Sequence, residues 1–119
     1  MSQINIIKIA DKEYPELLKK IYDPPDELYI KGDVSALNGK CLAIVGTRTA
    51  TEYGKGISRK FAKELSRYGI TIVSGLADGI DTEAHKGALE AGGKTIAVFG
   101  CGIDKIFPAQ NMALAEEIE

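Results

Sequence analysis

The sequence predicts an α/β fold in which a parallel sheet is flanked by helices. Three short apolar runs, residues 41–45, 70–73 and 95–99, have the length and continuity of strands that are covered on both faces. Two longer stretches with helical spacing separate these runs, and both end at glycine. Strands that alternate with helices are typical of a parallel sheet with right-handed crossovers, so this sheet is expected to form the core.

The first helical stretch repeats an apolar residue every four positions, at Ile57, Phe61 and Leu65, and stops at Gly69. These three side chains are expected to face the core. The basic residues of the stretch point mostly elsewhere and form either a solvated face or a track for nucleic acid; they are Lys55, Arg59, Lys60, Lys63 and Arg67. The second helix is expected in residues 79–93, and a further one near Asn111.

A lead-in segment, residues 1–40, precedes this pattern, which occupies residues 41–119. Within the lead-in, Leu17, Leu18 and Ile21 have helical spacing, and Pro15 suits a first helical turn, so residues 14–21 are expected to be helical. A turn at residues 24–25 and a short strand at residues 28–31 follow.

Composition excludes several classes of protein. The chain has 119 residues, 45% of them hydrophobic, which is enough for one core. Its net charge of −2 argues against a generally basic nucleic-acid binder, so any anion site must be local. Cys41 and Cys101 lack metal-ligand spacing and are expected to be reduced and buried. Neither a signal peptide nor a membrane span is recognisable, which predicts a cytoplasmic protein.

Glycine follows each of the three predicted strands, in loops 46–54, 74–81 and 100–108. Ligands of parallel sheets bind at this edge, where glycine lets them approach backbone amides. Thr47, Thr49 and Ser74 add hydroxyl groups, and Arg48 adds a charge that can engage a phosphate bidentately. These features predict a phosphate cradle, although the glycines could also serve the strand-to-helix turns alone.

Other nucleotide motifs and catalytic sites are disfavoured. Neither GxxxxGK[ST] nor GxGxxG occurs. His85 is the one histidine and lies mid-helix, so a triad with Ser74 and Asp81 would need it to reach back more than a turn. Asp78 and Asp81 could form a carboxylate pair, but an aspartate at position 81 more often caps the helix. No cluster of residues suggests a metal site.

Three segments together resemble the DNA-processing protein A family, DprA or Smf: YPELLKKIYDPPDELYIKGD, AIVGTRTATEYG and TIVSGLADGIDTEAHKGALEAGGKTIAVFGCGIDKIFPAQN. The resemblance implies a three-layer, Rossmann-like domain that binds single-stranded DNA. It also implies roles in natural transformation and DNA uptake and in loading the RecA recombinase. No enzymatic activity and no cofactor are implied.

The family's phosphate-binding turn falls on Gly46, Thr47 and Arg48. Its second loop falls on Ser74, Gly75, Leu76, Ala77, Gly79, Ile80 and Asp81. In the third loop, Lys105 and Phe107 are the side chains most suited to face DNA, by phosphate neutralisation and base stacking, although Phe107 could equally belong to the core. Asp78 departs from many relatives and should weaken phosphate binding.

The resemblance covers roughly the first half of the family domain, so one edge of the strand at residues 41–45 should be open. Either the lead-in segment or a second copy of the chain, in a homo-oligomer, is expected to cover that edge.

Two other functions remain open. One is a small-nucleotide-binding module of related fold, although the GGxGTxxE segment of phosphoribohydrolases is absent. The other is a fragment without independent activity.

Overall fold

The computed structural model describes residues 4–99 and 112–118. The elements, in chain order, are β1 (Ile4–Lys8), α1 (Glu16–Lys19), β2 (Glu27–Lys31), the 3₁₀ helix η1 (Val34–Asn38), β3 (Cys41–Ala43), α2 (Glu52–Arg67), β4 (Thr71–Ser74), α3 (Ile80–Glu90), β5 (Thr95–Ala97) and α4 (Met112–Ile118). None of the helices in these residues has both the length and the apolar character needed to cross a membrane.

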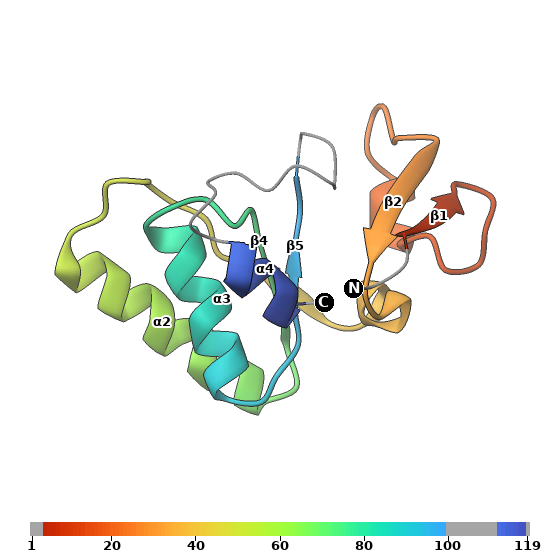
Figure 1. Ribbon diagram of the computed structural model, residues 1–119. Coiled ribbons are helices and arrows are strands. Elements are labelled where there is room, and N and C mark those ends of the chain that lie inside the picture. The colour runs from red at the N-terminus through yellow and green to blue at the C-terminus, as the bar shows by residue number, and fades with distance from the viewer. Residues whose placement is uncertain (1–3, 100–111, 119) are drawn as a thin grey trace.

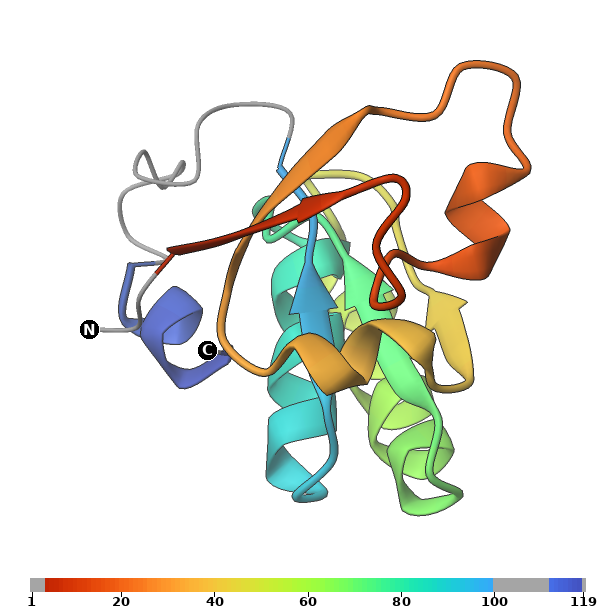
Figure 2. The same cartoon turned by 90° about the vertical axis from the view of Figure 1, so that its right-hand side faces the viewer.

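The main sheet is parallel, with strand order β3-β4-β5. Helices α2 and α3 cover one face of it, and η1 lies on the opposite side (Figures 1 and 2). This arrangement confirms the predicted α/β fold with a parallel sheet flanked by helices. Ile72, in the central strand, is fully buried and forms the core with Ala62 of α2 and with Ala84 and Ala88 of α3.

The interface between α2 and α3 is lined with small residues. Ser58, Ala62 and Ser66, four residues apart, are the buried positions of α2. On α3, a Cβ atom added at Gly87 would overlap with the backbone oxygen of Arg59 and lie 3.0 Å from the Ala62 side chain. The predicted apolar stripe was therefore wrong in part: Phe61 is 59% exposed, because the close approach of the helices turns the small residues inward.

The lead-in segment forms a separate two-stranded sheet. Strands β1 and β2 pair antiparallel, with Ile6 opposite Tyr29. The predicted strand in residues 28–31 is confirmed as β2, whereas β1 was not predicted. Tyr14 is fully buried, and its hydroxyl donates a hydrogen bond to the Pro25 oxygen over 2.7 Å. The expected helix at residues 14–21 is reduced to the four residues of α1, since Leu17 is 79% exposed and has no core to pack against.

The expectation that β3 and Cys41 are buried was wrong. Its three residues are exposed, including Cys41, because β3 is an edge strand and is not covered on both faces. The predicted open edge of β3 is confirmed within the described residues, and β1 and β2 pair with each other rather than with it. Cover of this edge by a second copy of the chain stays a prediction. Cys101 lies outside the described residues.

Candidate nucleic-acid interface

The loop after β3 presents a short polar surface. Thr47, Arg48 and Thr49 are all exposed. Thr47 Oγ1 accepts a hydrogen bond from the Thr49 amide over 3.2 Å and lies 3.3 Å from Thr49 Oγ1. Thr51 ends the loop by capping α2, with its hydroxyl accepting the Gly54 amide proton over 3.0 Å. The loop is therefore ordered by its own hydroxyl groups and leads directly into a helix.

Arg48 is the cation of this surface. Within residues 4–99 and 112–118, its guanidinium makes neither an ion pair nor a hydrogen bond. An exposed guanidinium has five N–H donors arranged in a fork, a geometry that matches phosphate oxygens. As far as the described residues show, the side chain that the sequence predicts to bind phosphate is available for it.

The loop after β4 is largely bonded within the protein. Ser74 is buried, and its hydroxyl donates to the Ile44 oxygen over 2.6 Å. Leu76 is fully buried and has a positive φ of 61°. The Ala77 oxygen accepts two hydrogen bonds from Thr82, one from its amide and one from its hydroxyl. This loop supports the first one, and its contacts with DNA stay a prediction.

Asp81 does not cap α3, contrary to expectation. The N-cap is Gly79, at a φ of 79°, and Asp81 lies in the first turn. The difference arises because the Asp81 carboxylate is occupied elsewhere: Oδ1 accepts the Gly46 amide proton over 3.3 Å, and Oδ2 accepts that of Gly75 over 3.1 Å. One buried carboxylate thus joins the loops after β3 and β4. This role could not be predicted from the sequence, because residues 46, 75 and 81 come together only in the folded protein.

The glycines of both loops are explained by packing within the protein. A Cβ atom at Gly46 would lie 2.7 Å from Ile80 Cγ1, and one at Gly75 would lie 2.8 Å from Asp81 Oδ2. At Gly79 it would overlap with the backbone oxygen of Thr47. Of the two explanations left open for these glycines, close internal packing is sufficient.

Lys105 and Phe107, predicted to face DNA from the third loop, lie outside the described residues. Asp78, the acidic residue in the turn before α3, is half-buried.

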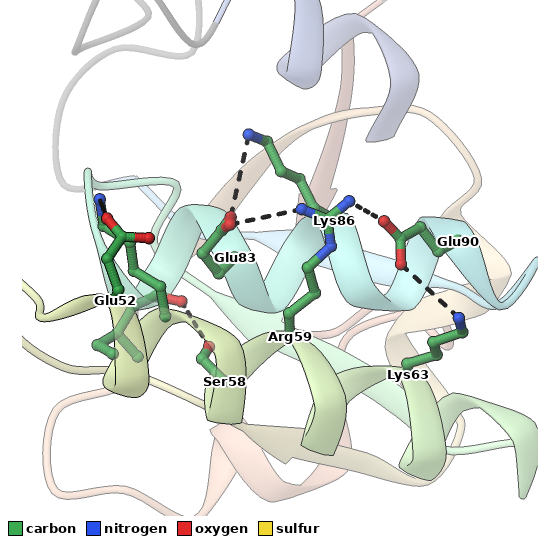
Figure 3. A network of polar contacts seen from close by, with 9 residues as sticks. Glu52, Ser58, Arg59, Lys63, Glu83, Lys86 and Glu90 are labelled. Atoms are coloured by element: carbon green, nitrogen blue, oxygen red, sulfur yellow. Dashed lines mark hydrogen bonds and ion pairs between the residues drawn. The ribbon is translucent and has the colours of Figure 1, made fainter.

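The basic residues of α2 mostly pair with acids. Figure 3 shows Arg59 between Glu83 and Glu90 of α3. Lys63 lies 3.9 Å from Glu90, and Arg67 and Lys55 pair with acids of their own helix. Lys60 is the exception within the described parts of the chain. This pairing favours the interpretation that the basic residues of α2 form a solvated face with ion pairs to α3, rather than a track for nucleic acid.

His85 does not form a catalytic triad. Its Nδ1 atom lies 2.7 Å from Thr95 Oγ1, while the Ser74 hydroxyl donates to a backbone oxygen. Among the described residues, no group of His, Cys, Asp and Glu side chains could hold a metal ion.

Comparison with known proteins decides the family. Residues 5–119 match the family model described as DNA recombination-mediator protein A. The chain belongs to this family.

Two curated relatives in the DprA/Smf family illustrate the similarity. The DNA processing protein DprA of Bacillus subtilis is 47% identical over 97% of this chain and 39% of its own length. The protein Smf of Escherichia coli is 43% identical over 92% of this chain and 29% of its own length. The chain therefore spans less than half of the curated relatives it matches.

Solved structures agree with the family assignment. The DprA structure from Streptococcus pneumoniae superimposes with a TM-score of 0.91 and 41% identity, over 98% of this chain and 41% of the other. DNA processing protein A from Helicobacter pylori, whose structure concerns its single-stranded DNA binding mode, superimposes with a TM-score of 0.81 and 34% identity, over 99% of this chain and 54% of the other. These neighbours confirm the Rossmann-like fold.

Proposed function

We propose that this chain binds single-stranded DNA through backbone phosphates at the carboxyl end of β3. The observation that carries the proposal is Arg48, an exposed cation that has no partner among residues 4–99 and 112–118 and that follows Thr47 in a loop ordered by its own hydroxyl groups. The structure of the Helicobacter pylori relative, which concerns single-stranded DNA binding, supports this choice of ligand. The family resemblance implies further contacts at Gly46, Ser74, Gly75, Leu76, Ala77, Gly79, Lys105 and Phe107. Of these, Ser74 and Leu76 are buried and the amides of Gly46 and Gly75 are bonded to Asp81, so these four support the site from within.

A small-nucleotide pocket is the weaker alternative. Nucleotide phosphates in Rossmann-like domains bind to the amides of the turn after the strand. Here the amide protons of Gly46 and Gly75 are already donated to Asp81. The exposed side chains of Thr47 and Arg48 remain available. They suit a phosphate at the protein surface, such as one in the backbone of an extended DNA strand.

The wider role that we propose is that of the family, without catalysis. It comprises handling of incoming DNA in natural transformation, loading of RecA and self-association, all in the cytoplasm. The division into a lead-in segment, residues 1–40, and a Rossmann-like part, residues 41–119, belongs to the same proposal.

A binding titration tests the function. Fluorescent oligothymidylates of increasing length should bind more tightly with length, with a log–log salt slope of about −0.7 per phosphate contacted. Thymidine monophosphate and ATP are the competitors. Competition by a mononucleotide at concentrations similar to the oligomer would favour the small-nucleotide module. Absence of binding to either ligand would favour a fragment without independent activity.

A further inference from the structure

Residues 79–81, at the start of α3, contact the backbone of the proposed DNA-binding loop at three consecutive points. Gly79 packs against the backbone oxygens of Thr47 and Arg48, so closely that an added Cβ atom would lie 2.8 Å from the latter. The Ile80 amide donates to the Thr47 oxygen over 3.2 Å. The Asp81 carboxylate accepts the Gly46 amide proton over 3.3 Å. The first turn of α3 thus bonds the Gly46 amide and the Thr47 oxygen and packs against the Arg48 backbone.

Residues 80 and 81 are themselves bonded to other parts of the protein. Asp81 is buried, at 6% exposure, and its second oxygen accepts the Gly75 amide proton over 3.1 Å. The Ile80 oxygen accepts a hydrogen bond from Ser58 Oγ of α2 over 2.8 Å. The turn of α3 therefore links the loop after β3 to the loop after β4 and to α2.

The same loop is exposed to solvent at Thr47 and Arg48. The Thr47 oxygen is nevertheless bonded to the Ile80 amide, and Gly79 packs against the Arg48 backbone. A backbone that is fixed before binding loses less conformational entropy when its side chains engage a ligand. A carboxylate suits this task because its two oxygens can each accept a backbone amide proton, here those of Gly46 and Gly75.

From this geometry we infer that Asp81 is a positioning residue of the DNA site: it fixes residues 46–48 so that Arg48 meets phosphate in one arrangement, and it does not touch DNA itself. The inference rests on the proposed function. It assigns the acidic end of the SGLADGID segment to support of the first loop, with Arg48 as the group it acts through.

A double-mutant cycle between Asp81→Asn and Arg48→Ala tests the inference. An Asn side chain has one acceptor oxygen, so one of the two glycine amides loses its partner. Asp81→Asn is expected to weaken oligothymidylate binding about tenfold, comparable to re-ordering one residue's backbone. In the Arg48→Ala background the same change should cost less than about twofold, because the group that it positions is absent.

Two further variants separate positioning from loss of stability. Thr95→Val removes a buried hydroxyl that bonds His85 and the Ile72 oxygen but none of residues 46–48 or 79–81, and should leave affinity unchanged at temperatures where circular dichroism reports a folded chain. Gly75→Ala places a Cβ atom 2.8 Å from Asp81 Oδ2 and displaces the carboxylate while keeping its charge. It should reproduce the loss of affinity even if Asp81→Asn does not fold.

Each outcome decides something different. Equal losses in both backgrounds, or parent-like affinity of Asp81→Asn and Gly75→Ala, would overturn the positioning role while leaving the proposed function intact. Failure of the unmodified chain to bind any oligomer would overturn both.

Discussion

His85 has its protonation state fixed by its neighbours. The Thr95 hydroxyl donates its one proton to the Ile72 oxygen, so His85 must donate from Nδ1 to Thr95. Nε2 then carries a lone pair, and it has no hydrogen-bond partner among the described residues. Burial lowers the pKa of His85 to about 4, although the nearby Asp81 charge acts in the opposite direction. The ring is therefore neutral in the folded protein at pH 7.

Acid should destabilise the fold through this residue. The unfolded chain takes up a proton near the ordinary histidine pKa of about 6.5, whereas the folded chain does so only near 4, so stability falls as pH drops through this window. Between pH 7 and about 5.5 the expected loss is about 1 kcal/mol in the free energy of unfolding, measured by urea denaturation. His85→Asn keeps a donor near Nδ1 but cannot titrate, so its stability should change little over this window. An NMR titration that places the folded pKa near 6.5 would contradict the account.

Only some residues of the candidate site could be predicted from the sequence. Thr47 and Arg48 could be found because they follow a strand that is recognisable from its apolar run. The role of Asp81 could not, since it depends on how α3 crosses the ends of β3 and β4. A role that depends on the neighbouring sequence can therefore be predicted, whereas a role that depends on bonds between distant segments cannot.

At the scale of elements, the close packing between α2 and α3 makes the interface sensitive to added volume. Gly87→Ala places a methyl group against the Arg59 backbone oxygen and should destabilise the protein by about 1–3 kcal/mol, despite the better helix propensity of alanine. Gly56, in the exposed face of α2, has no atom within 4 Å of an added Cβ. Gly56→Ala should therefore stabilise by about 0.5–1 kcal/mol. Thermal or urea unfolding of both variants gives the comparison, and changes of the same sign would contradict close packing at Gly87.

The helices and strands of the parallel sheet could be predicted from the sequence, but the packing between α2 and α3 could not. Helices α2 and α3 and strands β3, β4 and β5 could be assigned from period and apolar runs, but the inward face of α2 could not. Ser58 and Ser66 are buried because the helices approach closely, a property of the pair that the sequence of α2 does not carry. Strand β1 was missed because its partner β2 lies across an intervening helix and turn.

At the scale of the molecule, the parallel sheet gathers the loops after β3 and β4 at one edge, and α3 ties them together. The strand order follows from the alternation of strands and helices, and it leaves β3 as an edge strand. Arg48 stands at the carboxyl end of that strand, exposed and unpaired within the described residues. The central claim is that this cation holds a phosphate of single-stranded DNA.

The most direct test compares Arg48→Ala with Arg67→Ala in oligothymidylate binding at two salt concentrations. Arg67 is a matched control, because it is an exposed arginine paired with Glu64 at the far end of α2. Arg48→Ala is expected to weaken binding about tenfold and to reduce the salt slope by about 0.7, the contribution of one phosphate contact. Arg67→Ala should leave both quantities nearly unchanged. Equal effects of the two variants, or an unchanged salt slope for Arg48→Ala, would contradict the assignment of the phosphate site to the end of β3.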